Sequence, residues 1–553
     1  MRRLFDLGAM MQDGVRLSAD IYLPDDEGAA PAILVRTPYD NTRPDFVDWA
    51  RFFTGHGYAV VLQDTRGRGD SDGVFTPWLD DFDDGYDSVE WVAAQSWCNG
   101  KVGMLGGSYM AWVQWTAAAR NPPHLAALVT AGSPGRWFRD WPYRFGAFWA
   151  EDYVEWVNRI SGRSYQPPTA IDWNDLHEHR HPRAMDRTLG RPMPHWHECL
   201  DHTTLDDFWQ RLAITGYEAM DLPTLHVTGW FDACAPGELH HFREMVAVSP
   251  AARDQALLVG AWGHGGACNT GEAIEGAFDL GAEASLDLPA VWLAWFDRWL
   301  RGIETAVLPP VRYFAMGANA WRTADAWPPS DASEQTWYLH GDGSLATEPS
   351  GTPSSRSFDY DPADPTPGIE HLSPEPLGDW SPRDLAFLER RADVLVYTSE
   401  RFDDPIEIAG PIQLLLQASS SATDTDFAAI LTDVAPDGRA IFLSHGILRA
   451  SFRESLSNPT PLVPGERYSL PIELAELGHV VLPGHRLRVI VTSCLFPYYH
   501  PNPNTGASYG EEGDGDFVVA SQTVYADPVQ PSRLTVFVRR QHPDEILQVR
   551  SSE

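Results

Sequence analysis

The first part of the chain alternates short, uninterrupted apolar runs with longer segments of helical periodicity. The apolar runs fall at residues 32–36, 58–63, 102–105, 125–131, 224–228 and 256–260. Residues 46–55, 83–95 and 290–301 have the spacing of helices with one buried face. Strands that alternate with helices predict βαβ units and a parallel sheet. Residues 9–24 alternate apolar and polar positions around an Asp-Gly pair, which predicts a hairpin before this sheet.

Between the fourth and fifth apolar runs the pattern changes. Residues 136–160 are dense in Trp, Phe and Tyr and become amphipathic in their second half, and the stretch that follows to about residue 217 is polar and rich in histidine. It lacks the alternation of strands, so it predicts a mainly helical insertion into the α/β domain. We therefore place the α/β domain at residues 1–136 and 220–334, and a helical cap at residues 137–219.

Beyond about residue 335 turn residues become frequent and helical periodicity disappears. Strand-like runs fall at residues 412–419, 426–434, 440–452, 486–493 and 533–540, separated by turns. Evenly spaced short strands predict a β-sandwich, most simply a jelly roll. An all-β domain is therefore predicted at residues 335–553, after the α/β domain.

Composition narrows the classes of function. With 41 basic and 77 acidic side chains, the formal charge of −36 repels phosphates and argues against nucleic acid or an anionic membrane as a partner. No apolar run is long enough for a signal peptide or a membrane span, so we expect a soluble, cytoplasmic protein. Five widely spaced cysteines fit reduced thiols in that compartment. We predict no cofactor.

A candidate nucleophile lies where the period changes from strand to helix. The apolar run at residues 102–105 is followed by Gly106-Gly107-Ser108 and then by a helical pattern. A nucleophile elbow places its serine at such a turn and needs small neighbours, which Gly106 and Ala111 supply. The pattern is G-x-S-x-x-A rather than G-x-S-x-G, so a plain strand-to-helix connection is the alternative interpretation.

Two later residues complete the set that a serine nucleophile needs. Asp232 follows the run at residues 224–228, and His264 follows the run at residues 256–260. Because an α/β sheet presents catalytic groups at the carboxyl ends of its strands, both are expected near Ser108. The chain order Ser, Asp, His is the order found in α/β-hydrolases.

Several longer motifs carry a resemblance to a known family. They are DGVRLSADIYLP (13–24), RTPYD (36–40), QDTRGRGDSDG (63–73), WCNGKVGMLGGSY (97–109), GWFD (229–232), WGH (262–264), TDTDFAAILTDVAPDGRA (423–440) and LPGHRLRVIV (482–491). With them the chain resembles the cocaine esterase family of α/β-hydrolases, relatives of α-amino acid ester hydrolases and X-prolyl dipeptidyl peptidases. The resemblance implies an α/β-hydrolase domain with a helical cap insertion and a C-terminal, galactose-binding-like jelly roll.

The resemblance also assigns roles. It implies that Ser108 is the nucleophile, His264 the general base and Asp232 the orienting acid, and that the Tyr39 hydroxyl and the Tyr109 backbone N–H form the oxyanion hole. Tyr109 opens the helix after the elbow, so its N–H lacks an intrahelical acceptor and lies at the positive helix end. A phenol is a strong neutral donor near neutral pH. For Tyr39, a merely packed aromatic at the end of a strand is the alternative.

The substrate pocket departs from part of the family pattern. Amino-acid ester hydrolases carry acidic residues after the catalytic Asp that bind the substrate's ammonium group, whereas Cys234 and Ala235 stand there in this chain. Asp140 resembles another part of that cluster, but one carboxylate would hold an ammonium group weakly, which favours an uncharged acyl group. The pocket residues we predict are Asp140, Trp141, Phe148, Trp149, Trp230 and Cys234. The aromatic run at residues 137–156 can be cap core, pocket wall, or both.

Other patterns allow rival interpretations. Histidines cluster at residues 177–181 and 195–202, but no zinc-ligand spacing is present, so a polar cap surface is expected and no metal site is predicted. His240-His241 are expected to be structural. The tripeptide Arg68-Gly69-Asp70 resembles an adhesion motif but is interpreted as a turn.

The predicted function is a serine carboxylesterase that cleaves a small-molecule ester through an acyl-enzyme. An amidase, acylase, α-amino acid ester hydrolase or dipeptidyl peptidase with the same triad is the first alternative. A binding protein on an inactive hydrolase fold is the second. The sequence names neither the substrate nor the oligomeric state, for which a homodimer is the working hypothesis.

Overall fold

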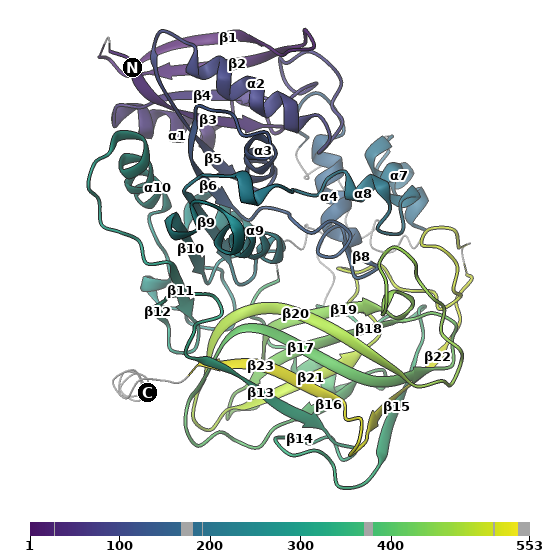
Figure 1. The fold of residues 1–553 in the computed structure, drawn as a ribbon. Helices are drawn as coiled ribbons and strands as arrows, with labels where there is room; N and C mark the ends of the chain where they lie inside the picture. The colour runs from purple at the N-terminus through teal and green to yellow at the C-terminus, as the bar shows by residue number, and fades with distance from the viewer. Residues whose placement is uncertain (27, 167–180, 191, 370–379, 513–514, 540–553) are drawn as a thin grey trace.

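The computed structural model describes residues 1–26, 28–166, 181–190, 192–369, 380–512 and 515–539. Among them, one large sheet has the strand order β1-β2-β4-β3-β5-β6-β9-β10-β11-β12 (Figure 1). Its strands are β1 (Arg2–Met10), β2 (Arg16–Leu23), β3 (Ala30–Thr37), β4 (Ala59–Asp64), β5 (Cys98–Gly107), β6 (Leu125–Ala131), β9 (Thr224–Gly229), β10 (Gln255–Gly260), β11 (Val311–Ala315) and β12 (Ala320–Ala324).

The centre of this sheet is parallel, as the apolar runs predict. Strands β4, β3, β5, β6, β9, β10 and β11 pair in parallel, while β1, β2 and β12 pair antiparallel at the two edges. Every residue of β3, β4, β9 and β10 is buried, which explains why these strands lack polar alternation. The carboxyl ends of β5, β9 and β10 therefore meet at one edge, where the candidate catalytic residues follow.

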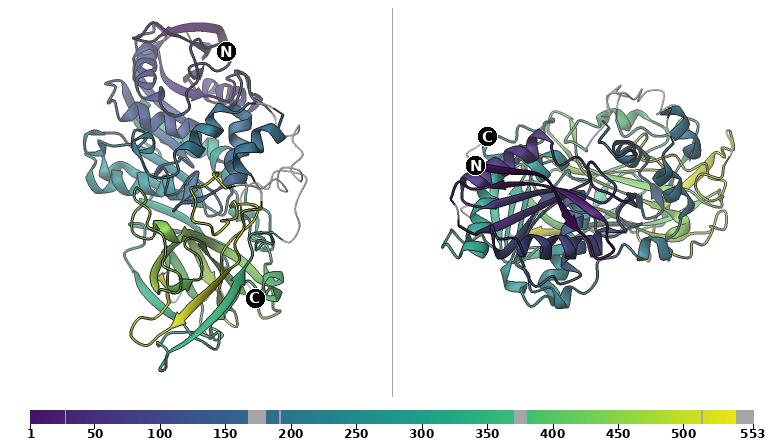
Figure 2. Two further views of the ribbon diagram at one scale, coloured as in Figure 1. Left: turned by 90° about the vertical axis from the view of Figure 1, so that its right-hand side faces the viewer. Right: turned by 90° about the horizontal axis from the view of Figure 1, so that it is seen from above.

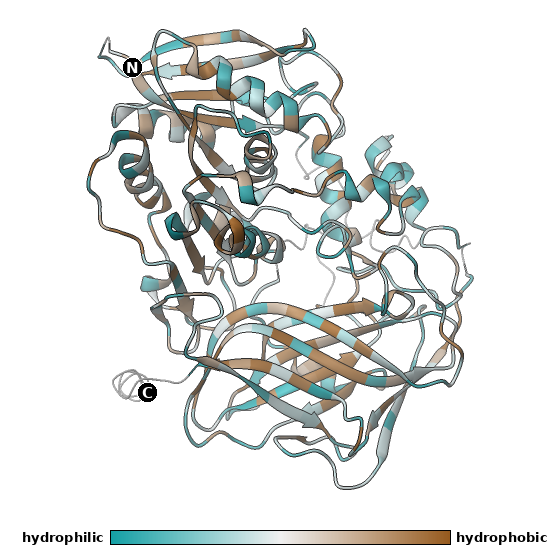
Figure 3. Ribbon diagram, in the orientation of Figure 1, coloured by the Kyte–Doolittle hydropathy of each residue, from teal (hydrophilic) through white to brown (hydrophobic). Residues whose placement is uncertain are grey.

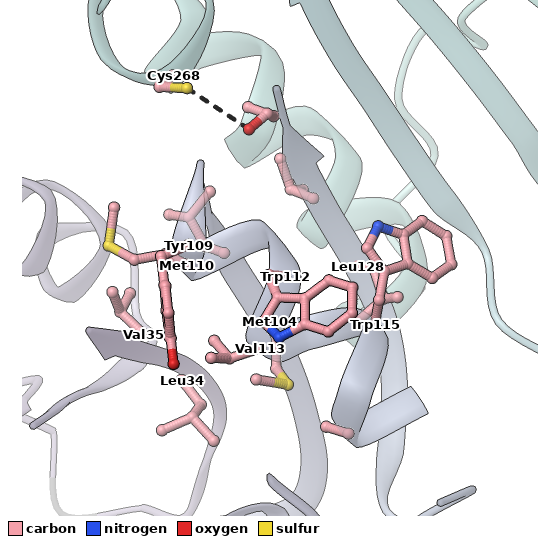
Figure 4. Close-up of a cluster of buried hydrophobic side chains, with 14 of the residues drawn as sticks. Leu34, Val35, Met104, Tyr109, Met110, Trp112, Val113, Trp115, Leu128 and Cys268 are labelled. Carbon is pink, nitrogen blue, oxygen red and sulfur yellow. Dashed lines mark hydrogen bonds between the residues drawn. The ribbon is translucent and has the colours of Figure 1, made fainter. Parts of the chain in front are cut away.

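Helices cover both faces of the sheet. They include α1 (Pro44–Gly55), α2 (Asp81–Ala93), α3 (Tyr109–Ala118), α9 (Ala235–Val248) and α10 (Leu288–Phe296). All ten residues of α3 are buried. In Figure 4 its side chains, Trp112 and Val113 among them, lie beside Leu34 of β3 and Met104 of β5. Because α3 is buried on all sides, its position is fixed by packing. Ser108 directly precedes its first turn and is therefore held in place as well.

The insertion between β6 and β9 is mainly helical in its described residues, as predicted. It contains the short hairpin β7 (Tyr143–Arg144) and β8 (Ala147–Phe148), followed by α4 (Ala150–Ile160), α6 (Met185–Thr188), α7 (Pro194–Asp201) and α8 (Asp207–Gln210). These helices gather beside the sheet and above the C-terminal strands (Figures 1 and 2). His177 and His179 of the first histidine cluster lie outside the described residues.

The C-terminal part is all-β and antiparallel, which confirms the predicted class. One sheet contains β14-β13-β23-β17-β22-β15 with β20 beside β17, and the other β16-β21-β18-β19. The strands are β13 (Ala332–Leu339), β14 (Leu345–Ala346), β15 (Ser354–Tyr360), β16 (Leu395–Thr398), β17 (Ile406–Ser420), β18 (Asp426–Val434), β19 (Ala440–Arg449), β20 (Tyr468–Val481), β21 (Arg486–Thr492), β22 (Ala520–Ala526) and β23 (Arg533–Arg539). Alternating brown and teal along several of them marks a buried and an exposed face (Figure 3).

The two parts are joined by more than the chain. The segment after β11 pairs with β20: Met316 N–H donates to Gly478 O at 3.0 Å, and Val480 N–H donates to Met316 O at 2.7 Å. The α/β sheet ends with β12 at Ala324, and the first strand of the sandwich begins at Ala332. In the part of the chain that is described, none of the helices combines the length and the apolar character that crossing a membrane requires.

Candidate active site

A sharp turn between β5 and α3 presents Ser108. Its backbone has φ 61° and ψ −127°, a conformation that residues other than glycine rarely adopt. Contacts on the strand side hold it there, because the Ser108 N–H donates to Ala131 O at 2.8 Å. A Cβ on Gly106 would lie 2.4 Å from the Cβ of Met110, so the turn needs glycine two positions before the serine. The strand, turn and helix of a nucleophile elbow are all present.

The loops after β9 and β10 bring Asp232 and His264 together. The Nδ1 atom of His264 is 2.8 Å from Oδ1 of Asp232, whose side chain is fully buried. The same carboxylate accepts hydrogen bonds from Thr228 Oγ1 at 3.0 Å and from the Cys234 N–H at 2.8 Å. Three donors on one buried carboxylate fix its orientation, and with it the orientation of the imidazole.

Two glycines without side chains leave space for Asp232 and His264. Gly132, after β6, has φ 53°, and a Cβ there would lie 2.5 Å from Oδ2 of Asp232 and 3.2 Å from Nδ1 of His264. Gly107 allows a second approach, because its Cβ would lie 2.6 Å from the sulfur of Cys268. Glycine at both positions lets the loops after β5, β6, β9 and β10 converge on one point.

Cys268 lies against the imidazole of His264. Its sulfur is 3.7 Å from Nδ1 and 3.8 Å from Nε2, so it sits over the ring rather than in line with one nitrogen. Burial disfavours the imidazolium and lowers the pKa of His264, whereas the electrostatic interactions with Cys268 and with the Asp232 carboxylate raise it. The attraction is the larger effect, and the pKa of His264 lies well above its usual value.

The two tyrosines predicted for the oxyanion hole occupy different positions. The Tyr39 hydroxyl interacts with the side chain of Ser108 and accepts a hydrogen bond from Trp156 Nε1 at 3.0 Å. Burial raises the pKa of Tyr39, so its hydroxyl keeps its proton and can donate. Tyr109 begins α3, and its N–H is among those that the helix itself cannot satisfy. The Tyr39 hydroxyl therefore lies at the serine side chain, and the Tyr109 N–H lies at the start of the helix that follows the serine.

The side chain of Tyr109 points away from the site. Its hydroxyl donates to Asp81 and accepts from the Trp78 N–H at 2.9 Å. Burial raises the pKa of Asp81 to about 6. Tyr109 therefore offers the cavity only its backbone, while its ring anchors the first turn of α3 to α2.

A buried arginine ties the loop of Tyr39 to the cap. Arg68 is fully buried, and its guanidinium donates to Pro38 O at 2.7 Å and to Ile160 O at 2.8 Å, the second at the end of α4. Burial lowers its pKa to about 10. The Arg68 side chain is therefore bound inside the protein and is not available to a partner, in agreement with the interpretation of Arg68-Gly69-Asp70 as a turn rather than an adhesion motif.

A cavity of about 330 Å³ opens in front of Ser108 and His264. The α/β domain contributes aromatic lining, including Tyr39, Phe46 and Trp78. The cap contributes Trp141 and, from α4, Glu151, Asp152, Glu155, Trp156 and Arg159. Helix α4 thus supplies three acidic side chains and one arginine to the cavity wall.

The structure separates the predicted pocket residues into two groups. Trp141 and Cys234 line the cavity. Asp140, Phe148, Trp149 and Trp230 lie outside its lining. Asp140 is instead bound at both oxygens by Arg136, at 2.8 Å each. The three aromatic side chains pack elsewhere: Phe148 on Tyr143 and Tyr509, Trp149 on Tyr499, and Trp230 on Tyr313 and Trp327. Their aromatic character serves packing around the cap and β-sandwich instead of substrate contact.

The acidic residues of α4 that line the cavity were not predicted, because they belong to no known catalytic or binding motif. Glu151 and Glu155 are as buried as the apolar residues of this helix. Glu155 pairs with Arg159, and burial raises the pKa of Glu155 to about 7. Asp152 accepts a hydrogen bond from Trp141 Nε1 at 2.5 Å, and burial raises the pKa of Asp152 too. The sequence does contain three acidic residues within five positions at the start of this helix, which is the one signal that pointed to them.

The histidines considered as rivals have structural partners. His197 lies 2.8 Å from Asp186, His202 lies 2.6 Å from Asp206, and His195 lies 3.6 Å from Glu198. His241 is fully buried, 2.7 Å from the Tyr217 hydroxyl and 3.0 Å from Pro134 O, and burial holds its pKa well below the usual value. None of these side chains lines the cavity in front of Ser108.

Comparison with protein families matches both parts of the chain. Residues 13–266 match the X-Pro dipeptidyl-peptidase (S15) family, and residues 305–535 match the X-Pro dipeptidyl-peptidase C-terminal non-catalytic domain. The first match includes Ser108, Asp232 and His264.

Individual relatives cover nearly the whole chain. Cocaine esterase of Rhodococcus sp. (strain MB1 Bresler) is 37% identical over 95% of this chain and 96% of its own length. Two solved structures are similar throughout. An aminopeptidase from the marine sediment archaeon Thaumarchaeota archaeon has 25% identity, a TM-score of 0.87 and coverage of 98% and 96% of the two chains. An α-amino acid ester hydrolase has 28% identity, a TM-score of 0.85 and coverage of 97% and 96%.

Proposed function

Because the chain belongs to the X-Pro dipeptidyl-peptidase (S15) family and is a serine hydrolase acting on ester bonds, we propose that it cleaves small carboxylic esters with Ser108 as nucleophile. His264 is the general base and Asp232 its orienting acid. The contact that carries this proposal is the 2.8 Å pair of His264 and Asp232, which borders the same cavity as Ser108. Tyr39, at the serine hydroxyl, and the Tyr109 N–H provide the oxyanion hole.

The reaction proceeds in two stages. His264 takes the proton of Ser108 as the serine oxygen attacks the ester carbonyl, and Asp232 stabilises the imidazolium that results. Tyr39 and the Tyr109 N–H hold the oxyanion, and the intermediate collapses as His264 gives its proton to the departing alcohol. Water, activated by His264, then attacks the acyl-enzyme and releases the acid and Ser108.

A fluorophosphonate probe tests the proposed nucleophile. Phosphonylation should add the mass of the probe to the peptide that contains Ser108, and the Ser108→Ala variant should stay unlabelled. A wild-type protein that resists the probe would favour a binding role on an inactive hydrolase fold. Matched ester and amide substrates with one acyl group then separate an esterase from an amidase or acylase.

A second candidate substrate class is an ester that also carries a protonated amine. The absence of acids at Cys234 and Ala235 favours an uncharged acyl group, but Glu151, Asp152 and Glu155 reach the cavity from α4 instead. The two arginines of the lining are engaged, Arg43 with Asp45 and Arg159 with Glu155. This arrangement leaves an excess of acidic groups beside aromatic rings, an environment suited to an ammonium group.

One pair of substrates distinguishes these two classes. Methyl phenylacetate and methyl phenylglycinate share one carbon skeleton, and only the second carries an α-ammonium group. A higher kcat/KM for the phenylglycinate ester would support an amine-bearing substrate, whereas a preference for phenylacetate would support the uncharged acyl group.

Location and assembly are further proposals. All five cysteines are free thiols, four of them buried, which suits a reducing compartment such as the cytoplasm. The homodimer stays a working hypothesis, which sedimentation of the purified protein would test. A small-molecule ester remains the expected partner, and the charge of −36 still argues against nucleic acid.

A further inference from the structure

The cavity holds two thiols that the ester reaction does not use. Cys234 follows Asp232 by two positions at the start of α9, and Cys268 lies over the ring of His264. Both line the cavity in front of Ser108. Thiol, imidazole and carboxylate side chains gathered at one place are the donor types that bind zinc and similar cations.

Three of these groups have the separation of a metal-ligand set. One side-chain donor atom each from Asp232, Cys234 and His264 lies within 4.8 Å of the other two. Bond lengths of about 2.0–2.3 Å and a tetrahedral angle would place ligand atoms roughly 3.4–3.6 Å apart around Zn²⁺. Nδ1 of His264 and Oδ1 of Asp232 are 2.8 Å apart, so these two ligand atoms would move slightly apart on binding. The sulfur of Cys268, 3.7 Å and 3.8 Å from the two ring nitrogens, lies nearby as a further donor.

We propose that Asp232, Cys234 and His264 form an inhibitory site for a soft divalent cation, of which Zn²⁺ is the chemical type. Binding joins the cation to the carboxylate, the imidazole and the thiolate, and releases the thiol proton to solvent. If Nδ1 binds the cation, its proton moves to Nε2 and the bond to Asp232 is lost. With that proton on Nε2, the imidazole can no longer accept the proton of Ser108. The inhibition, though not the binding, rests on the proposed role of His264 as base.

Access to the site supports this proposal. Among the five cysteines, Cys234 is the half-exposed one and the other four are buried. His264 is also partly exposed, with a side-chain exposure of 31%, so both ligands can be reached from the cavity. The site joins two loops about thirty residues apart in the chain, which is why no zinc spacing appears in the sequence.

Cobalt provides a test that does not depend on activity. Co²⁺ added alone to the full-length protein should give a near-ultraviolet thiolate-to-cobalt absorption with one ion per chain, and the Cys234→Ser variant should lose it. The matched control is Cys98→Ser, at the opposite end of β5 from Ser108, which should keep the absorption. Surface carboxylates bind Co²⁺ without this absorption. No thiolate absorption in the wild type, or an equal one in Cys234→Ser, would overturn the proposal.

Zinc then tests the consequence for catalysis. Zn²⁺ should inhibit hydrolysis of a p-nitrophenyl ester reversibly, with recovery on addition of EDTA. The concentration for half-inhibition, measured against each variant's own metal-free rate, should rise about tenfold or more in Cys234→Ser and stay unchanged in Cys98→Ser. Equal sensitivity of Cys234→Ser and wild type would overturn the proposal. Ser108→Ala separates the two hypotheses: it should bind Co²⁺ normally, and if it retained esterase activity, the proposed function would fail while the metal site stood.

Discussion

Two regions meet at the cavity, and they contribute their side chains from different kinds of structure. The strand-end loops of the α/β sheet supply Ser108, Asp232 and His264, each directly after a buried parallel strand. Helix α4 of the cap supplies Glu151, Asp152 and Trp156 from the face of a helix inserted into that fold. The first region holds the groups proposed to react, and the second adds acidic and aromatic side chains to the cavity wall. The chemistry and the substrate preference can therefore be changed separately.

The largest effect is expected in the first region. Ser108→Ala removes the proposed nucleophile and should lower kcat by roughly 10⁴- to 10⁶-fold, while the melting temperature changes little. Hydrolysis of a p-nitrophenyl ester and a thermal unfolding curve check both parts. Activity close to wild type would show that Ser108 is not the nucleophile and that the strand-end loops do not hold the reacting groups.

Tyr39→Phe should have the next largest effect, because it deletes one donor of the proposed oxyanion hole. We expect a loss of about 2 to 4 kcal/mol of transition-state stabilisation, a ~30- to 1,000-fold fall in kcat with little change in KM. Steady-state kinetics on the same ester measure it. An unchanged kcat would mean that Tyr39 is only a packed aromatic.

In the second region, Asp152→Asn should act on preference instead of on chemistry. If the cap binds an ammonium group, the variant should lose about 10- to 100-fold in kcat/KM for methyl phenylglycinate and change little for methyl phenylacetate. Asp186→Asn is the matched control, since Asp186 belongs to the cap but pairs with His197 outside the cavity lining. Equal losses on both esters would show that Asp152 is structural.

The pH dependence reports on the first region alone. As the proposed general base His264 must be neutral to react, and the pKa of this imidazole lies well above the usual histidine value. For a neutral ester, kcat/KM should therefore fall about tenfold per pH unit as the pH drops below that pKa, and level off above it. A profile that is already flat at pH 6 would contradict this environment for His264.

The smallest effect is expected where the two regions touch. Trp156→Phe removes the N–H that donates to the Tyr39 hydroxyl and keeps most of the ring packing. A neutral hydrogen bond of about 0.5 to 1.5 kcal/mol corresponds to a two- to twelvefold loss of kcat/KM on a neutral ester. In the Tyr39→Phe background the same substitution should cost less, since its partner is already gone. Equal losses in the two backgrounds would show that the regions act independently.

Much of the first region could be predicted from the sequence, because buried parallel strands are continuous apolar runs and catalytic loops follow them. The strand at residues 125–131 agrees with β6 at both ends, and the runs at 224–228 and 256–260 differ from β9 and β10 by one residue. In the sandwich, β18 agrees at both ends, whereas β13, β14, β15, β16, β20 and β22 were not predicted. In β15 and β22 the alternating polar residues resemble loops.

The second region could not be predicted in the same way. Helical periodicity identifies which residues of α4 are inward, but a core and a cavity wall produce the same pattern. Phe148 and Trp149 are buried as expected yet pack on other aromatic side chains, while Glu151 and Glu155 are buried on the side that faces Ser108. The decisive information is the position of the helix over the sheet, which depends on contacts such as Arg68 with Ile160 O.

The paired backbone of Met316 has a consequence for anyone who wishes to shorten this enzyme. Its N–H and C=O are both satisfied by β20, so a cut between β12 and β13 would strip two hydrogen bonds from the last strands of the catalytic sheet and uncover Tyr313, which packs against Gly478. The C-terminal sandwich thus covers and hydrogen-bonds the edge of the catalytic sheet. A shortened enzyme would need polar residues at the surface that this domain now buries.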